Sequence, residues 1–388
     1  MRVLFFLIFI TAPGIVFAQR PHVSKVADWF EQGYYILNPT ISKGGQEVAF
    51  VTQLSGRDST KGDRKTIRQV TQNFLPKTGK ETRQFDPVIT LFNTQKKTIS
   101  LLDYGWAPAF SPNDNRIAYA FQTNALQKPD KLYADDYKGN TIKIFDRSSS
   151  RSAVVANPLG NYLLDPFFID SLHLVYKSGD KVNGPFGGAI SVNEVDLATG
   201  KTTPVRPPVI RHRLYELVGE TYLINKRLAY IIYTPVDSGT GMANEYQHLL
   251  LSGKDTLHDF GVRRFTNLTY KFAVNNNSDV LFLDDEHFFA EDTNYLATYK
   301  NNRLISNRPV NFNYTKAFLS PNAKYILYID EALDVYLVNV KDFSKTKLDR
   351  PRKEVHVVAW NTQTQQLVLV QDHKNLAGTD QLLMYKIR

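Results

Sequence analysis

Basic side chains gather in two segments of this chain of 388 residues, and both groups could hold an anionic partner. The larger group lies in segment 53–87, where lysine and arginine outnumber the acidic residues. Five of its members are candidate binding residues: Arg57, Lys61, Arg64, Lys65 and Arg68. The electrostatic field of a long basic loop attracts anionic partners, which could be an acidic polysaccharide, a nucleic acid or an acidic protein surface.

The second basic group includes Arg211, His212 and Arg213, which are further candidate binding residues. Neighbouring guanidinium groups form bidentate hydrogen bonds to carboxylates or phosphates. Both groups also fit a simpler interpretation, solvated charge with no specific partner, because runs of charge often serve solubility alone. The sequence is compatible with either interpretation.

The known sequence motifs for catalysis are missing. The chain has no Gly-x-Ser-x-Gly nucleophile elbow and no pair of histidines at the i, i+4 spacing of a metalloprotease helix. His173, His248 and His356 lie within apolar strand patterns, and we interpret them as structural. We therefore predict no catalytic residue, no bound metal and no cofactor.

One acidic stretch places carboxylates beside a histidine. Its residues are Asp284, Asp285, Glu286, His287, Glu291 and Asp292. Carboxylates and imidazole bind divalent cations when they converge on one point. Residues adjacent in sequence rarely converge in this way, and the spacing of an EF-hand loop is missing, so we interpret the stretch as an acidic surface loop.

A repeated pattern of strand, polar turn and strand determines where these groups lie. Seven apolar second strands recur along the chain, at 48–50, 117–119, 174–176, 228–230, 280–282, 326–328 and 367–369, each followed by a third strand. Evenly recurring four-stranded units are typical of propeller blades. The prediction is an all-β fold, a seven-bladed β-propeller of four-stranded antiparallel blades, with segment 53–87 as an insertion between two strands of the first blade.

The seventh repeat stops after its third strand, which would leave an unpaired edge. We expect a strand from the beginning of the chain to close the ring, with Gly33 to Leu37 as the donor. The segment from Val23 to Gln32 is the one place where a short helix fits the apolar spacing. In a four-stranded blade, the loops after the second strands share one end of the ring with the links between blades, so the long insertions should gather at one mouth of the channel.

The first residues of the chain have the pattern of a secretory signal peptide. Arg2 precedes an apolar stretch, and Ala18 completes a small-residue cleavage site, so we expect residues 1–18 to be removed and 19–388 to form one propeller domain. We predict a periplasmic or secreted location and no transmembrane segment. Export disfavours a nucleic-acid partner despite the net charge of +9.

The repeats resemble the TolB-like propeller family, which is related to the propellers of dipeptidyl-peptidase-type enzymes. The resemblance is strongest at Ala109–Asp114 and Phe318–Ala323, where Ser-Pro-Asn occupies the turn. The family usually has Asp-Gly after the Ser-Pro, and this chain departs from that pattern. The resemblance implies the fold, but neither the Tol–Pal role nor peptidase activity can be carried over, since one fold serves many functions.

The combined prediction is an exported, non-catalytic binding or scaffold propeller. It would recognise an envelope protein, a peptide or an acidic polysaccharide through its loop-rich face. The alternative is a propeller enzyme, a lyase or hydrolase that acts on an anionic glycan with residues from several blades.

Overall fold

The seven apolar second strands form the buried centres of seven sheets. Val48, Ala49, Phe50 and Val51 are all fully buried, because a second strand packs against both neighbouring blades and has no solvent face. A continuous apolar run, rather than an alternating one, is the expected sequence of a strand that is covered on both sides.

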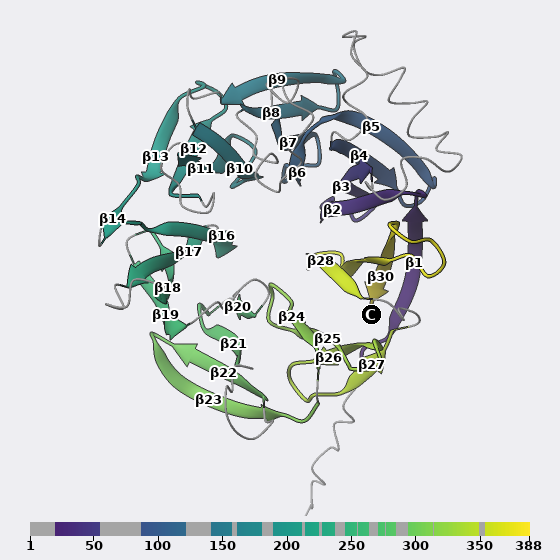
Figure 1. Ribbon diagram of the computed structural model, residues 1–388, viewed down its shortest axis with the longest axis vertical. Helices are drawn as coiled ribbons and strands as arrows, with labels where there is room; N and C mark the ends of the chain where they lie inside the picture. The colour runs from purple at the N-terminus through teal and green to yellow at the C-terminus, as the bar shows by residue number, and fades with distance from the viewer. Residues whose placement is uncertain are drawn as a thin grey trace, which may run out of the picture.

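The computed structural model describes residues 20–54, 87–121, 141–156, 161–180, 189–211, 214–224, 227–236, 245–253, 255–263, 271–275, 277–284, 294–312, 314–348 and 354–388. Strands in these segments form seven four-stranded antiparallel sheets and one small hairpin, and no helix occurs in them. The sheets stand radially around one axis, which confirms the predicted seven-bladed β-propeller (Figure 1).

Each of the first three blades is built from four consecutive strands. Blade 1 contains β2 (Tyr34–Ile41), β3 (Glu47–Leu54), β4 (Val88–Asn93) and β5 (Thr98–Tyr104). Blade 2 contains β6 (Trp106–Phe110), β7 (Arg116–Phe121), β8 (Thr141–Asp146) and β9 (Arg151–Ala156). Blade 3 contains β10 (Asn161–Phe168), β11 (His173–Asp180), β12 (Ser191–Asp196) and β13 (Thr202–Arg206).

The next three blades repeat this order, and a hairpin of β14 (Ile210–Arg211) and β15 (Leu214–Tyr215) precedes them. Blade 4 contains β16 (Leu217–Ile224), β17 (Arg227–Val236), β18 (Glu245–Ser252) and β19 (Asp255–Arg263). Blade 5 contains β20 (Phe272–Val274), β21 (Val280–Asp284), β22 (Asn294–Lys300) and β23 (Arg303–Val310). Blade 6 contains β24 (Lys316–Leu319), β25 (Tyr325–Ile329), β26 (Val335–Asn339) and β27 (Lys345–Lys347).

Blade 7 combines the two ends of the chain. Its strands, from the channel outward, are β28 (Val355–Asn361), β29 (Gln366–Asp372), β30 (Asp380–Ile387) and β1 (Val23–Phe30). The antiparallel pairing of β1 with β30 runs from Val23 opposite Ile387 to Phe30 opposite Gln381. Figure 1 shows β1 as the outer strand beside β30. The predicted closure by an N-terminal strand is therefore confirmed.

Two details of that prediction were wrong. The segment from Val23 to Gln32 is largely the strand β1, not a helix. The segment from Gly33 to Leu37 is not the donor, because it belongs mainly to β2, the innermost strand of blade 1, which pairs with β3. The missing position in blade 7 is its outer edge, and β1, which precedes the first blade, occupies it.

Apolar side chains fill every junction between neighbouring blades. One cluster joins blades 1, 2 and 3, and others join blades 3 and 4, 4 and 5, 5 and 6, 6 and 7, and 7 and 1. The core is thus a ring of interfaces rather than one central mass. Each blade depends on both neighbours to cover its apolar faces.

A serine closes the turn between the first two strands in several blades. In blade 2 the Ser111 hydroxyl donates to Asn113 and accepts the backbone N–H of Arg116, at 2.8 and 3.0 Å. Ser320 makes the same two contacts in blade 6, with Asn322 and the N–H of Tyr325, both at 2.9 Å. This geometry is the physical basis of the Ser-Pro-Asn repeat.

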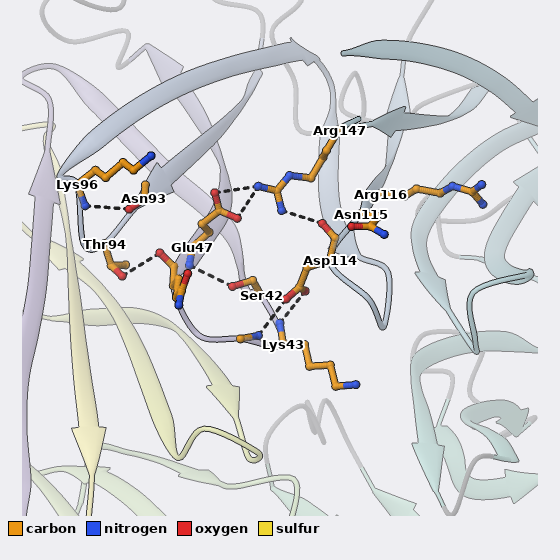
Figure 2. A network of polar contacts seen from close by, with 12 residues as sticks. Ser42, Lys43, Glu47, Asn93, Thr94, Lys96, Asp114, Asn115, Arg116 and Arg147 are labelled. Atoms are coloured by element: carbon orange, nitrogen blue, oxygen red, sulfur yellow. Dashed lines mark hydrogen bonds and ion pairs between the residues drawn. The ribbon is translucent and has the colours of Figure 1, made fainter. Parts of the chain in front are cut away.

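Polar contacts fasten these turns to the adjacent blade. Figure 2 shows the Asp114 carboxylate between blades 1 and 2, where it accepts the backbone N–H groups of Lys43 and Gly44 at 2.7 and 2.9 Å. In the same network the Arg147 guanidinium of blade 2 forms an ion pair of 2.7 Å with Glu47 of blade 1. Charge-assisted hydrogen bonds of this kind hold a junction in one register.

The closing strand generates the first prediction. Ala27 of β1 is 2% exposed and packs in the cluster between blades 7 and 1, whereas its neighbour Val26 is 40% exposed. We expect Ala27→Asp to lower the free energy of unfolding by about 3 kcal/mol, because it buries an unpaired charge at the closure. Val26→Asp, the matched control, should cost less than about 1 kcal/mol. Urea denaturation followed by tryptophan fluorescence measures both values, and equal losses would contradict the role of this face of β1.

Candidate functional site

A cavity of about 480 Å³ lies in the central channel. Its walls come from the first strands of blades 1, 4, 5, 6 and 7 and from the turns that follow them. The lining residues are Pro39, Thr40, Ile41, Glu220, Thr221, Tyr222, Leu223, Ile224, Phe272, Ala273, Val274, Leu319, Pro321, Val358, Ala359 and Trp360. The size falls within the range of pockets that hold small molecules or a short stretch of peptide.

The lining is mostly apolar and includes three large aromatic residues. Tyr222 of blade 4 and Phe272 of blade 5 meet edge to face, with ring centroids 5.0 Å apart. Trp360 of blade 7 is the third aromatic residue of the lining. Among the described lining residues, Glu220 is the one with an ionisable carboxyl group, and its Oε2 accepts a hydrogen bond of 3.3 Å from the Tyr233 hydroxyl. This chemistry suits an apolar ligand group with a positive charge beside it.

Strand direction places the cavity at one end of the channel. The lining residues of β2, β16 and β28 come from the second halves of these strands, close to the turns that lead to the second strands. Insertion 53–87 connects β3 to β4, so it leaves and re-enters the fold at the opposite end. The two points at which the insertion joins the described strands therefore lie at the end opposite the cavity.

The structure leaves most of the predicted basic site untested. Arg57, Lys61, Arg64, Lys65 and Arg68 lie outside the described residues. His212 and Arg213 also lie outside them, as do the residues of the acidic stretch from Asp285 onward. Binding by these groups stays a prediction.

Arg211 is the one candidate binding residue whose contacts are described. Its Nε lies 2.5 Å from Oε1 of Glu216, and the other oxygen of Glu216 pairs with Arg206. Glu216 and Arg206 are buried, whereas the Arg211 side chain is mostly exposed. Burial is the main influence on Arg206 and lowers its pKa, while the charge of Glu216 acts in the opposite direction. Arg211 thus helps to hold the hairpin between blades 3 and 4 and still faces solvent.

A second group of ionisable residues lies at the other end of the channel, on the edge of blade 7. His356 begins β28, Asp372 ends β29 and Asp380 begins β30, so antiparallel pairing brings the three to one edge of the sheet. The ligand-type atoms of these residues lie within 4.8 Å of one another. Burial raises the pKa of Asp380 to about 6, while its hydrogen bond from the Ile36 N–H lowers it.

The sequence interpretation missed this group, although it named His356 as structural. The three residues are spread over 25 positions, from 356 to 380, and no local motif joins them. The order of strands in the repeat could have indicated that these residues are neighbours. The first residues of strands one and three and the last residue of strand two always meet at the same edge of a blade, so polar residues at these positions are neighbours in space.

The network around Glu216 generates the second prediction. Glu216→Ala should lower the free energy of unfolding by about 3 kcal/mol, because it leaves the buried Arg206 guanidinium without its carboxylate. Arg211→Ala should cost less than about 1 kcal/mol, since Glu216 keeps its buried partner and an exposed ion pair contributes little. Urea denaturation of the two variants gives both values. A larger loss for Arg211→Ala than for Glu216→Ala would reverse this assignment.

Comparison with known proteins supports the fold alone. No protein-family model and no curated protein matches the sequence. The β-propeller domain of the Trilobed protease from Pyrococcus furiosus is similar over 93% of this chain and 96% of its own, with a TM-score of 0.54 and 10% identity. An oligogalacturonate lyase in complex with manganese covers 96% of this chain and 94% of its own, with a TM-score of 0.56 and 12% identity. An acylaminoacyl peptidase covers 92% of this chain and 52% of its own, with a TM-score of 0.52 and 11% identity. The chain is thus similar in architecture to propellers of several enzymes.

Proposed function

We propose that this protein is a non-catalytic binding propeller whose channel cavity receives an apolar segment of a peptide or protein. The observation that carries the proposal is the cavity of about 480 Å³, with its aromatic lining and its single described carboxylate at Glu220. Aromatic side chains supply much of the contact energy in peptide recognition, and buried pockets at the centre of an interface hold the strongest contacts.

The chemistry of the cavity distinguishes among the partners that the sequence suggests. An acidic polysaccharide would meet the carboxylate of Glu220 and no basic group among the described lining residues. A peptide that carries an apolar side chain and a nearby lysine, arginine or amino terminus would find complementary groups. We therefore favour a peptide or protein partner for the channel. The basic insertion 53–87 remains a proposed second contact for an acidic surface.

The setting of this binding is also a proposal. The signal-peptide pattern before Ala18 supports export, which would make the partner a component of the cell envelope or of the exterior. The resemblance of the repeats to TolB-like propellers supports the same interpretation. Within the described residues there is no helix with the length and apolarity needed to cross a bilayer.

A second candidate function, an enzyme acting on an anionic glycan, is favoured by one observation. His356, Asp372 and Asp380 place an imidazole and two carboxylates together at the channel end that lies opposite the cavity. Groups of this kind supply general acids and bases. We rank this function second because the Asp380 carboxylate already accepts the Ile36 N–H at 2.9 Å and His356 is already paired with Asp372 at 2.9 Å.

Incubation with uronic-acid oligosaccharides, with and without a divalent cation, tests the second function. A lyase would produce the ultraviolet absorbance of an unsaturated product, and a hydrolase would release new reducing ends. Activity that His356→Gln abolishes would contradict the proposal that the propeller is non-catalytic.

The cavity generates the third prediction, which tests the proposed function. Leu223 lines the cavity and is 42% exposed, so Leu223→Arg fills the space without disturbing the core. Peptides selected on the wild-type protein from a random display library should bind this variant at least about tenfold more weakly, a loss of about 1.4 kcal/mol. Fluorescence anisotropy with the selected peptides measures the affinities.

Leu304→Arg is the matched control. Leu304 is 54% exposed and belongs to β23, the outer strand of blade 5. Figure 1 shows that β23 lies far from the channel axis. This variant should bind the selected peptides as the wild type does, and both variants should melt close to the wild-type temperature. Equal affinities of the three proteins, or failure of the library to yield a binder, would refute the channel as a peptide site.

A further inference from the structure

The edge of blade 7 next to blade 1 has the donor set of a metal site. His356 and Asp372 are partly exposed and Asp380 is buried, and their ligand-type atoms lie within 4.8 Å of one another. They come from three adjacent strands of one antiparallel sheet. A sheet holds such residues in fixed register, so small rotations of the two exposed side chains bring three donors to the separations that bonds of about 2.0–2.2 Å require.

Negative charge is in excess at this edge. His356 Nε2 contacts Asp372 Oδ1 at 2.9 Å, so a single imidazole faces the carboxylates of both Asp372 and Asp380. A third carboxylate, Glu354, lies next to them in sequence, but Lys316 of blade 6 neutralises it at 2.7 Å. The pair of aspartates thus has at most one positive partner in the described structure. A bound cation would remove the repulsion between them.

We propose that His356, Asp372 and Asp380 form a site for one divalent first-row metal ion, with Zn²⁺ and Mn²⁺ as the fitting ions. One imidazole nitrogen and two carboxylate oxygens make a mixed donor set, which suits these ions better than the all-oxygen set of Ca²⁺. The ion replaces the hydrogen bond between His356 and Asp372, and the displaced proton passes to solvent. Water completes the coordination on the exposed side.

The position of the site gives it a structural consequence. Asp380 Oδ2 accepts the backbone N–H of Ile36 at 2.9 Å, and the neighbouring Thr379 hydroxyl accepts that of Gly33 at 2.9 Å. The proposed ligand Asp380 therefore also holds the start of β2, and with it blade 1, against blade 7. An ion that orders Asp380 stabilises the junction at which the two ends of the chain meet.

Equilibrium dialysis of the full protein, purified without a histidine tag, against Zn²⁺ or Mn²⁺ tests the proposal. Elemental analysis should find one ion per chain. His356→Gln and Asp372→Asn should each weaken binding at least about tenfold. Loss of a residue that only hydrogen-bonds to a metal ligand already lowers metal affinity by about tenfold or more, and loss of the ligand itself should cost at least as much. Both residues are partly exposed, so both variants should fold, whereas Asp380→Asn also changes the contact to Ile36.

Blade 3 provides a matched control for these variants. His173 Nδ1 lies 2.9 Å from Asp170, and the two side chains are 37% and 53% exposed, against 36% and 54% for His356 and Asp372. Among the described residues, this pair belongs to no group of three converging ligands. His173→Gln and Asp170→Asn should leave the stoichiometry and the affinity unchanged.

The melting temperature provides a second readout. It should rise with the concentration of the bound ion in the wild type and in both blade 3 variants, because a ligand that binds only the folded protein stabilises it. The rise should be lost in His356→Gln and Asp372→Asn. The proposal fails if the wild type binds neither ion, or if the blade 7 variants bind as the wild type does.

Discussion

The pairing of β1 with β30 joins residues from opposite ends of the chain, and the ring depends on it. His22 and Arg388 exchange backbone hydrogen bonds of 3.1 and 2.8 Å at one end of this ladder. Because each blade covers its apolar faces only with its neighbours, an open seam would expose one face of blade 7 and one face of blade 1. The pairing also covers the outer edge of β30, an edge that would otherwise be available for association with other chains.

A closed ring gives the molecule two unlike ends. Short turns between first and second strands gather at one end, where side-chain hydrogen bonds fix them, as Asp114 and Asn361 do on either side of the turn at Ser42. The second strands end and the third strands begin at the other end. The cavity lies near the short turns, while His356, Asp372 and Asp380 lie at the end where second strands end and third strands begin. The proposed peptide site and the proposed ion site are therefore separate in space.

The repeats predicted the fold because the signal they contain is local. A second strand that is covered on both sides is apolar throughout, and this property, together with the polar turn before it, identified all seven second strands. The closing strand has a different character. Its register shifts between Lys25 and Ala27, where the exposed Val26 is an extra residue. The shift changes the alternation of a strand into a spacing that resembles a helix, which explains the incorrect prediction there.

The candidate sites were harder to predict because they depend on register between strands. Nothing in the sequence near His356 indicates that Asp372 and Asp380 lie beside it, since two strand pairings intervene. The cavity is assembled from five blades, and each contributes residues such as Ile41 or Val358 that are ordinary in a strand. The long basic insertion stands out by its content of lysine and arginine, but amino-acid composition does not determine where side chains lie.

The turns on either side of blade 1 show how one position of the repeat serves different contacts. The third residue after the turn serine has positive φ in each of three turns, and it is Gly45, Asp114 or Ala323. At Gly45 a β-carbon would lie 1.8 Å from the Gln366 side chain of blade 7, so a larger residue would have to displace that side chain, whose amide donates to the Gly45 carbonyl at 3.0 Å. At Asp114 the carboxylate instead accepts hydrogen bonds from backbone N–H groups of blade 1, on the side of that blade that faces blade 2. Blade 1 is thus held by blade 7 and blade 2 at its turn end and by Asp380 at its loop end. The short segment between β1 and β2 links blade 7 to blade 1 along the chain. These side-chain contacts, together with the apolar clusters on both flanks, fix the position of blade 1.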